Sequence, residues 1–91
     1  MTIQEFTNLV NETKSQSNLS FHSLANYLIK DLAEEVYTES TDEDEPTICK
    51  IYRLDDGFIA TIDNIHEDFS WFCGEFEVGK NYIKNMLQLL K

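Results

Sequence analysis

The segment TICKIYRLDDGFIATID (residues 47–63) decides the fold of this chain. Residues 47–53 are rich in β-branched and aromatic side chains, and residues 58–63 alternate between two sets of side chains, so both are predicted to be strands. Asp56 and Gly57 between them indicate a hairpin, because a type I′ turn needs positive φ at both central residues. The segment therefore predicts an antiparallel hairpin at the centre of the fold.

Downstream of this hairpin, the pattern predicts one more strand and a final helix. Residues 64–68 are expected to turn, and residues 69–73, which read FSWFC, to form a third strand. Gly74 and Gly79 interrupt the pattern, and apolar side chains then recur at helical spacing over residues 81–90. The C-terminal part is thus predicted to be a strand followed by an amphipathic helix.

Upstream of the hairpin, the pattern predicts two amphipathic helices. Thr2 and Glu5 form a capping box before a helix over residues 3–13. Ser20 can cap a second helix, whose apolar stripe continues to Val36. The carboxylates expected on the outer face of this second helix are Asp31, Glu34 and Glu35.

These elements predict a single acidic α+β domain over residues 1–91, in the order ααβββα. An acidic loop over residues 38–46 joins the second helix to the first strand. We expect a three-stranded antiparallel sheet with the helices packed on one face. Eleven aromatic residues in 91 are enough for one modest core, so the chain should fold rather than stay disordered.

Charge is distributed unevenly along the chain. Fifteen of its seventeen carboxylates lie between Asp31 and Glu77, where only Lys50 and Arg53 oppose them, so this part carries −13 against +3 in residues 78–91. Binding of phosphate needs clusters of Lys and Arg, so we expect no direct binding to nucleic acid or to anionic membranes. No apolar run reaches the ~18–20 residues of a membrane span, and no signal-peptide pattern opens the chain. The expected location is the cytoplasm.

The sequence offers little for catalysis or cofactor binding. His22 and His66 are predicted to be surface histidines rather than general bases. Together with Cys49 and Cys73 they lack the close ligand pairing of a zinc site, and three glycines make no phosphate-binding loop. We therefore predict no enzyme, no cofactor and no metal site. The two cysteines are predicted to be small buried hydrophobes, and a disulfide between them stays open.

The carboxylates as a set predict a surface for a basic partner. Self-repulsion on this scale disfavours compaction, so a function for the field is expected. Carboxylates on regular elements can lie roughly 6–8 Å apart, comparable with successive phosphates of a DNA strand, and would steer a Lys- and Arg-rich partner. The predicted partner-binding residues are Asp31, Glu34, Glu35, Glu39, Asp42, Glu43, Asp44, Asp55, Asp56, Glu67, Asp68, Glu75 and Glu77.

Aromatic residues of the third strand offer a second kind of surface. Phe69 and Trp71 are expected on one face of this strand and Phe72 on the other. Core packing is the simplest role for all three. An exposed set would instead be an interface anchor or a self-association face, and a homodimer would lengthen the acidic surface.

Small size, strong acidity, a mixed α/β outline and no catalytic constellation together resemble the DNA-mimic inhibitors that phages make against host defences. The anti-restriction nuclease protein of T-even phages and the small anti-CRISPR proteins belong to this class. Residues 39–43 (ESTDE) are similar to an acidic stretch of the phage uracil-DNA glycosylase inhibitor, although the helix expected after the strands departs from that family. The resemblance implies a non-enzymatic inhibitor, in the host cytoplasm, of a restriction nuclease, nucleoid protein, CRISPR effector or repair enzyme.

Two alternatives stay open. An immunity or antitoxin protein would bind one cognate toxin through a mixed aromatic and acidic patch, in which Trp71 or Tyr52 would dominate the affinity. An acidic adaptor would use its carboxylates only for solubility, and its affinity for a partner would then change little with salt.

Overall fold

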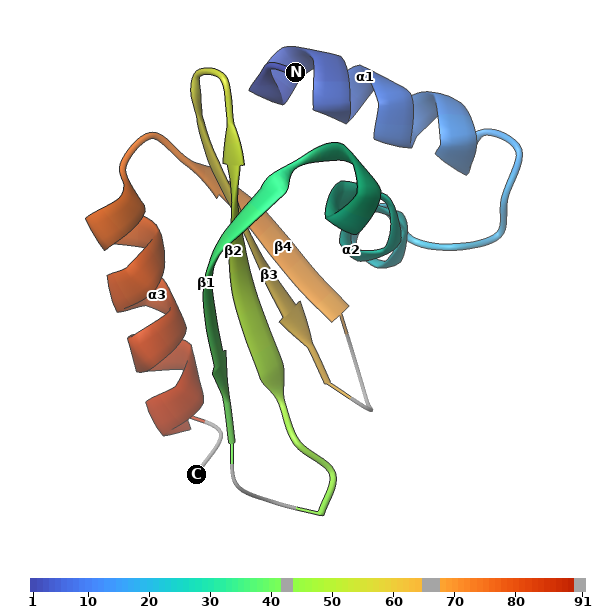
Figure 1. Ribbon diagram of the computed structural model, residues 1–91. Helices are drawn as coiled ribbons and strands as arrows, with labels where there is room; N and C mark the ends of the chain where they lie inside the picture. Colours follow the sequence, from blue (N-terminus) through green and yellow to red (C-terminus); the bar gives the residue numbers. More distant parts are fainter. Residues whose placement is uncertain (42–43, 65–67, 90–91) are drawn as a thin grey trace.

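Two helices, four strands and a third helix follow one another in the computed structural model, which describes residues 1–41, 44–64 and 68–89 (Figure 1). The strands form one antiparallel sheet in the order β1-β2-β3-β4, so each strand pairs with the next along the chain. Helices α1 and α2 pack on one face of this sheet and α3 on the other (Figure 1). The bounds are α1 Ile3–Lys14, α2 Phe21–Leu32, β1 Glu34–Ser40, β2 Ile48–Leu54, β3 Gly57–Asp63, β4 Asp68–Cys73 and α3 Phe76–Leu89.

The α+β class and the antiparallel meander are confirmed, but the sheet has one strand more than predicted. Strand β1 consists of residues that the sequence pattern assigned to the end of the second helix and to the acidic loop. The helix stops because Ala33 is already extended, at φ −144° and ψ 161°. Val36 and Tyr37, which favour strands, then pack beneath α3. Glu34 and Glu35 therefore lie on a strand, and their predicted place on a helix was wrong.

The predicted caps of the first two helices are confirmed. The Thr2 hydroxyl accepts a hydrogen bond from the Glu5 N–H at 3.1 Å, and the Glu5 carboxylate accepts one from the Thr2 N–H at 2.9 Å. Ser20 accepts from the Ser23 N–H at 3.1 Å. These bonds satisfy N–H groups that have no partner within a helix, which fixes where both helices begin.

The β2–β3 hairpin is confirmed, with a different turn from the one predicted. Leu54 pairs with Gly57, so Asp55 and Asp56 are the two loop residues. No residue in the described ranges has positive φ, so the turn is not type I′. Gly57 is needed for space instead, because a Cβ there would lie 2.8 Å from the Cys73 carbonyl oxygen. The glycine lets the hairpin approach the end of β4.

Hydrophobic clusters cover both faces of the sheet, so the prediction that all helices pack on one face was wrong. Neighbouring residues of β3 belong to different clusters: Ile59 faces α1 and α2, and Ala60 faces α3. The buried residues on the α1 and α2 face are Phe6, Val10, Leu24, Ala25, Ile29, Tyr52, Leu54 and Ile59. Those on the α3 face are Cys49, Ile51, Ala60, Ile62, Ile83 and Leu87.

Helix α3 begins at Phe76, earlier than the predicted start at residue 81. Gly79 lies inside this helix rather than before it. A Cβ at Gly79 would lie 2.9 Å from the Cys73 Sγ and 3.4 Å from the Ile51 Cδ1. The glycine therefore marks where the helix comes closest to the sheet.

The aromatic residues of β4 divide between the faces as predicted. Phe69 and Trp71 pack on the α3 face, and Phe72 packs on the other, where its ring lies 6.3 Å from that of Phe6. The Trp71 ring lies 3.9 Å from the ring of Tyr82 on α3. All three aromatic residues are half-buried, so core packing accounts for most of their surface.

The two cysteines are free and buried. Cys49 on β2 pairs with Ile62, and Cys73 on β4 pairs with Phe58, so β3 separates them. Two strand spacings of about 4.8 Å already exceed the ~7 Å Cα separation that a disulfide tolerates. The strand register therefore keeps Cys49 and Cys73 too far apart to form a disulfide. Burial, with the nearby Glu39 charge, raises the pKa of Cys49 to about 11.

Candidate partner-binding surface

Most exposed carboxylates gather at the two ends of the sheet. We call the end with the β2–β3 turn the hairpin end; β1 begins and β4 ends there. We call the opposite end the loop end, where β1 and β3 finish and β2 and β4 begin. The hairpin end carries the exposed Asp31, Glu34, Asp55, Asp56, Glu75 and Glu77; the loop end carries the exposed Asp44, Glu45 and Asp63 and the half-buried Glu39 and Asp68. The predicted partner-binding residues Asp42, Glu43 and Glu67 lie outside the described residues.

At the hairpin end, two of the predicted residues attach helix α1 to the sheet. The Asp56 carboxylate accepts a hydrogen bond from the Ile3 N–H at 2.8 Å, at the positive end of the helix dipole. The Met1 amino group donates to the Asp55 carboxylate at 2.8 Å. Asp55 and Asp56 are exposed, yet part of their hydrogen-bonding capacity already serves the fold.

On β1, the three predicted glutamates have partners within the chain. The Arg53 Nη1 lies 3.7 Å from Glu34, and the Lys50 Nζ lies 2.9 Å from Glu35, which raises the pKa of that lysine. The Tyr37 hydroxyl donates to the Glu39 carboxylate at 2.6 Å. This bond, aided by partial burial, raises the pKa of Tyr37 to about 12. These glutamates are therefore weaker candidates than the sequence suggested.

At the loop end, Asp63 and Asp68 form a pair of like charges. They are direct cross-strand neighbours, because Asp63 ends β3 and Asp68 begins β4. Partial burial, then the charge and the hydrogen bond of Asp68, raise the pKa of Asp63. A cation placed beside this pair would relieve the repulsion, so these two carboxylates are suited to receive a Lys or Arg side chain.

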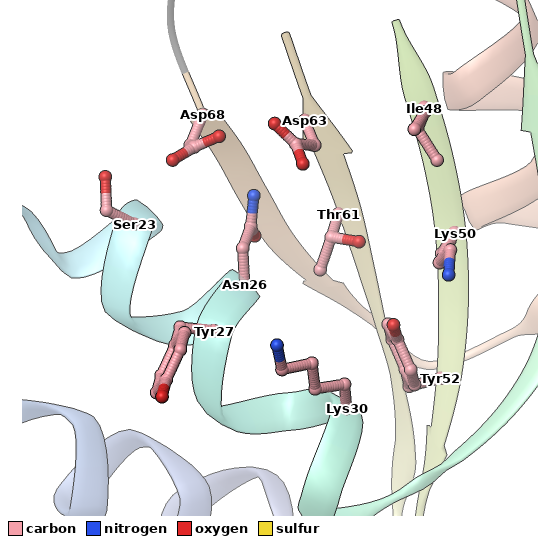
Figure 2. Close-up of a pocket in the computed structure, with 10 residues that line it drawn as sticks. All are labelled: Ser23, Asn26, Tyr27, Lys30, Ile48, Lys50, Tyr52, Thr61, Asp63 and Asp68. Carbon is pink, nitrogen blue, oxygen red and sulfur yellow. The ribbon is translucent and has the colours of Figure 1, made fainter. Parts of the chain in front are cut away.

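A groove of about 360 Å³ lies between α2 and the loop-end half of the sheet. Figure 2 shows Asp63 and Asp68 together at one end of it, with Asn26 beside them and Tyr52 and Lys30 toward the other. The Lys30 Nζ lies 4.7 Å from the centroid of the Tyr27 ring. The groove thus presents both charge signs. The residues that line it are Ser23, Asn26, Tyr27, Lys30, Ile48, Lys50, Tyr52, Thr61, Asp63 and Asp68.

This groove could hardly be predicted from the sequence. Its lining comes from α2 and three strands, and its two lysines are isolated in the chain. The alternation of Lys50 with buried apolar neighbours on β2 was the one available hint. It indicated a polar strip on one face of the sheet but not which helix would border it.

Both histidines were predicted to lie on the surface without a catalytic role. His22 lies on the first turn of α2, and its Nδ1 accepts a hydrogen bond from the Ser70 N–H at 3.0 Å. The Ser70 hydroxyl lies 2.8 Å from the same nitrogen. Because the nitrogen accepts from a backbone N–H, it carries no proton, and the imidazole joins α2 to β4. His66 lies outside the described residues.

The two aromatic anchors proposed for a toxin-binding patch differ in exposure. Tyr52 is only 5% exposed and belongs to the core, so that prediction is corrected. Trp71 is half-buried against Tyr82, which is itself 46% exposed. Trp71, together with Tyr82, is therefore the one of the two predicted anchors that stays available to a partner.

In comparisons with protein-family models, curated proteins and solved structures, nothing matches this chain. Within the described ranges, none of the helices has the length and apolar character needed to cross a membrane. The geometry of the carboxylates and of the groove is therefore the basis for a functional proposal.

Proposed function

We propose that this chain is a non-enzymatic DNA mimic, which inhibits a nucleic-acid-binding protein of a host by covering its basic surface. One observation carries the proposal: the exposed carboxylates concentrate at both ends of one sheet, in a chain of net charge −10. A protein that binds DNA through Lys and Arg would meet these carboxylates in place of phosphates. Long-range attraction would speed the encounter.

The spacing of the two acidic ends supports a long basic surface as the target. Strands of seven residues separate the ends by roughly 20 Å. A duplex carries one charge per ~1.7 Å of axis, so about 12 phosphates span that length. The carboxylates named above for the two ends are similar in number, and the molecule is 35 Å in its longest dimension. A cleft built to hold DNA would thus contact both ends together.

The carboxylates best suited to this role are those that do not already bind other groups of the chain. Asp31, Glu75 and Glu77 are exposed at the hairpin end, and Asp44 is exposed at the loop end. The Asp63 and Asp68 pair adds a site for one partner cation. Glu34, Glu35, Glu39, Asp55 and Asp56 would contribute less, because their oxygens already bind groups of the chain.

The immunity or antitoxin alternative depends on exposed aromatic anchors, and burial of Tyr52 removes one of the two. The adaptor alternative predicts an affinity that is insensitive to salt, so release of captured proteins by salt separates it from mimicry.

Capture of partners from bacterial lysate on the immobilised chain tests the proposal. Bound proteins should be DNA-binding proteins, and both high salt and excess duplex DNA should release them. The triple variant Asp31→Asn, Glu75→Gln, Glu77→Gln should weaken binding of the captured protein by about tenfold or more, or about 1.4 kcal/mol. Glu12→Gln on the exposed part of α1 is the control and should leave the affinity nearly unchanged. Retained proteins that resist both DNA and salt would refute mimicry.

A further inference from the structure

The two edges of the sheet differ in how they are protected from pairing with another chain. Edge strand β1 carries Glu34, Glu35 and Glu39, and its register shifts between Glu35 and Tyr37. Charges and bulges are the usual devices that keep an edge from pairing. Edge strand β4 pairs with β3 in unbroken register, and its residues 69–73 include no charged side chain. The β4 edge lacks both devices, and it is covered at Ser70 by the His22 ring of α2.

The hydrogen bond to His22 shows which backbone groups of β4 point outward. The Ser70 N–H donates to the His22 ring, so it points away from β3. In an antiparallel ladder, the N–H and C=O of one residue point to the same side, and successive residues alternate. The groups of Asp68, Ser70 and Phe72 therefore line the free edge of the sheet.

An exposed apolar stripe on α3 runs beside this edge. Val78, Tyr82 and Leu89 are 53%, 46% and 79% exposed, and their spacing places them on one side of the helix. The contact between Tyr82 and Trp71 shows that this side lies toward β4. The opposite side of α3 faces β1, where Lys80 lies 5.8 Å from the Tyr37 ring centroid.

We infer that the β4 edge and the α3 stripe form a self-association surface, through which a second copy of this chain pairs its own β4 antiparallel to the first. This goes beyond the proposed mimicry and does not depend on it. A twofold axis at Ser70 would place Asp68 opposite Phe72 of the second copy, and two four-stranded sheets would become one. Such an axis is perpendicular to the sheet, so both α3 stripes would lie on the same side and face each other.

Charge opposes a second copy less at this surface than at the acidic ends of the sheet. Two chains of net charge −10 repel each other wherever carboxylates meet. In the paired arrangement, the two Asp68 residues stand four residues apart along the strands, or about 14 Å. That separation exceeds the ~8–10 Å screening length near physiological salt, so their repulsion is small. For this pairing, the hydrogen bond between the Ser70 N–H and the His22 ring would break. The Ser70 N–H would then donate to a backbone carbonyl of the second copy.

Sedimentation velocity on the full chain over a range of concentrations, at high ionic strength, tests the inference. The chain should dimerise, and Ser70→Pro should abolish the dimer, because it removes an outward N–H without removing a bond to β3. Ser70→Ala is the matched control: it also loses the hydroxyl bond to His22 but keeps the N–H, so it should still dimerise.

A second pair of variants tests the stripe without touching the sheet. Val78→Glu with Leu89→Glu should raise the dimer dissociation constant by about a hundredfold or more. Asn81→Glu with Gln88→Glu adds the same charge on the outer side of α3 and should raise the dimer dissociation constant only severalfold. If circular dichroism shows that Ser70→Pro does not fold, the comparison of these two double variants tests the inference instead. A chain that stays monomeric at its solubility limit, or a dimer indifferent to the variants, would overturn the inference. So would a monomer in which Ser70→Pro blocks capture of another protein, since that would assign the edge to a different partner.

Discussion

The two faces of the sheet use the same strands and are covered differently. On the α3 face, β2 contributes Cys49 and Ile51, and apolar packing continues along the strand. On the opposite face, β2 contributes Leu54 and Tyr52 at the hairpin end, where α1 and α2 cover them. Toward the loop end the same face presents Lys50 to the groove. On this face, the apolar core therefore ends where Lys50 replaces an apolar residue on β2, and the groove begins there.

The physical reason is the cost of burying charge. A helix that covered Lys50 would have to remove an ammonium group from water without a buried partner. In the structure Lys50 instead pairs with Glu35 at the open side of the groove, and α2 lies over β3 and β4. On the α3 face, β2 and β3 instead present Cys49, Ile51, Ala60 and Ile62 to the helix, so α3 lies closely against the sheet.

The largest expected effect comes from breaking the closed face. Ile83 is fully buried beneath α3, and Ile83→Ala should lower the free energy of unfolding by about 2–5 kcal/mol through lost burial and a cavity. On the groove side, Tyr27 is 63% exposed, and Tyr27→Ala should cost less than about 1 kcal/mol. Urea denaturation measures both. Equal losses would mean that the two faces do not differ in packing.

A smaller effect tests how closely α3 fits the sheet. Alanine normally stabilises a helix relative to glycine by about 1 kcal/mol. Gly79→Ala should instead destabilise by about 1–3 kcal/mol, because the new Cβ meets the Cys73 Sγ at 2.9 Å. Gly74→Ala is the control: a Cβ there has no neighbour within 4 Å, so the stability should change by less than about 0.5 kcal/mol.

The double variant shows whether the sulfur causes this cost. In a Cys73→Ala background, Gly79→Ala should lose most of its penalty, since the two sites are in contact and their effects should not add. A penalty that is unchanged without the sulfur would place the obstruction elsewhere, at Ile51 or in the backbone.

The two faces also explain which parts of the fold the sequence could predict. The hairpin, the first helix and the caps of the first two helices follow from local patterns and were predicted nearly to their bounds. The second helix instead ends at Leu32 rather than near Val36, and the final helix begins at Phe76 rather than at residue 81. Strand β1 was missed because Leu28, Leu32 and Val36 continue a helical stripe, although Val36 and Tyr37 themselves favour a strand. Tertiary packing under α3 decided between the two.

That helices cover both faces of the sheet was predictable from the residues of β3. Phe58, Ile59, Ala60 and Ile62 make β3 apolar at both alternating positions, which is typical of a strand buried on both faces. The candidate site was harder. Composition predicted an acidic surface, but only pairing across strands shows that Glu35 is bound to Lys50 and that Asp63 lies beside Asp68. Both pairings depend on register, which a single sequence does not fix.

The smallest expected effect tests the open end of the groove face. Asp63→Asn should raise the free energy of unfolding at pH 7 by about 0.2–1 kcal/mol, because it removes a like charge directly opposite Asp68. Since the pKa of Asp63 is raised in the fold, the repulsion is present at neutral pH and disappears as the pH falls through that raised pKa. The gain should therefore vanish in acid.

Asp68→Asn should give a similar gain, and the two changes together should give little more than either, because each alone removes the same repulsion. Asp44→Asn at the same end is the control and should gain less, since Asp44 lies in a loop and faces no carboxylate in the strand pairs that the structure describes. Urea denaturation at pH 7 and in acid gives all four values. A loss of stability in Asp63→Asn at pH 7 would show that a bond accepted by this carboxylate outweighs the repulsion. The loop end of the groove would then be a closed polar cluster rather than a site held ready for a cation.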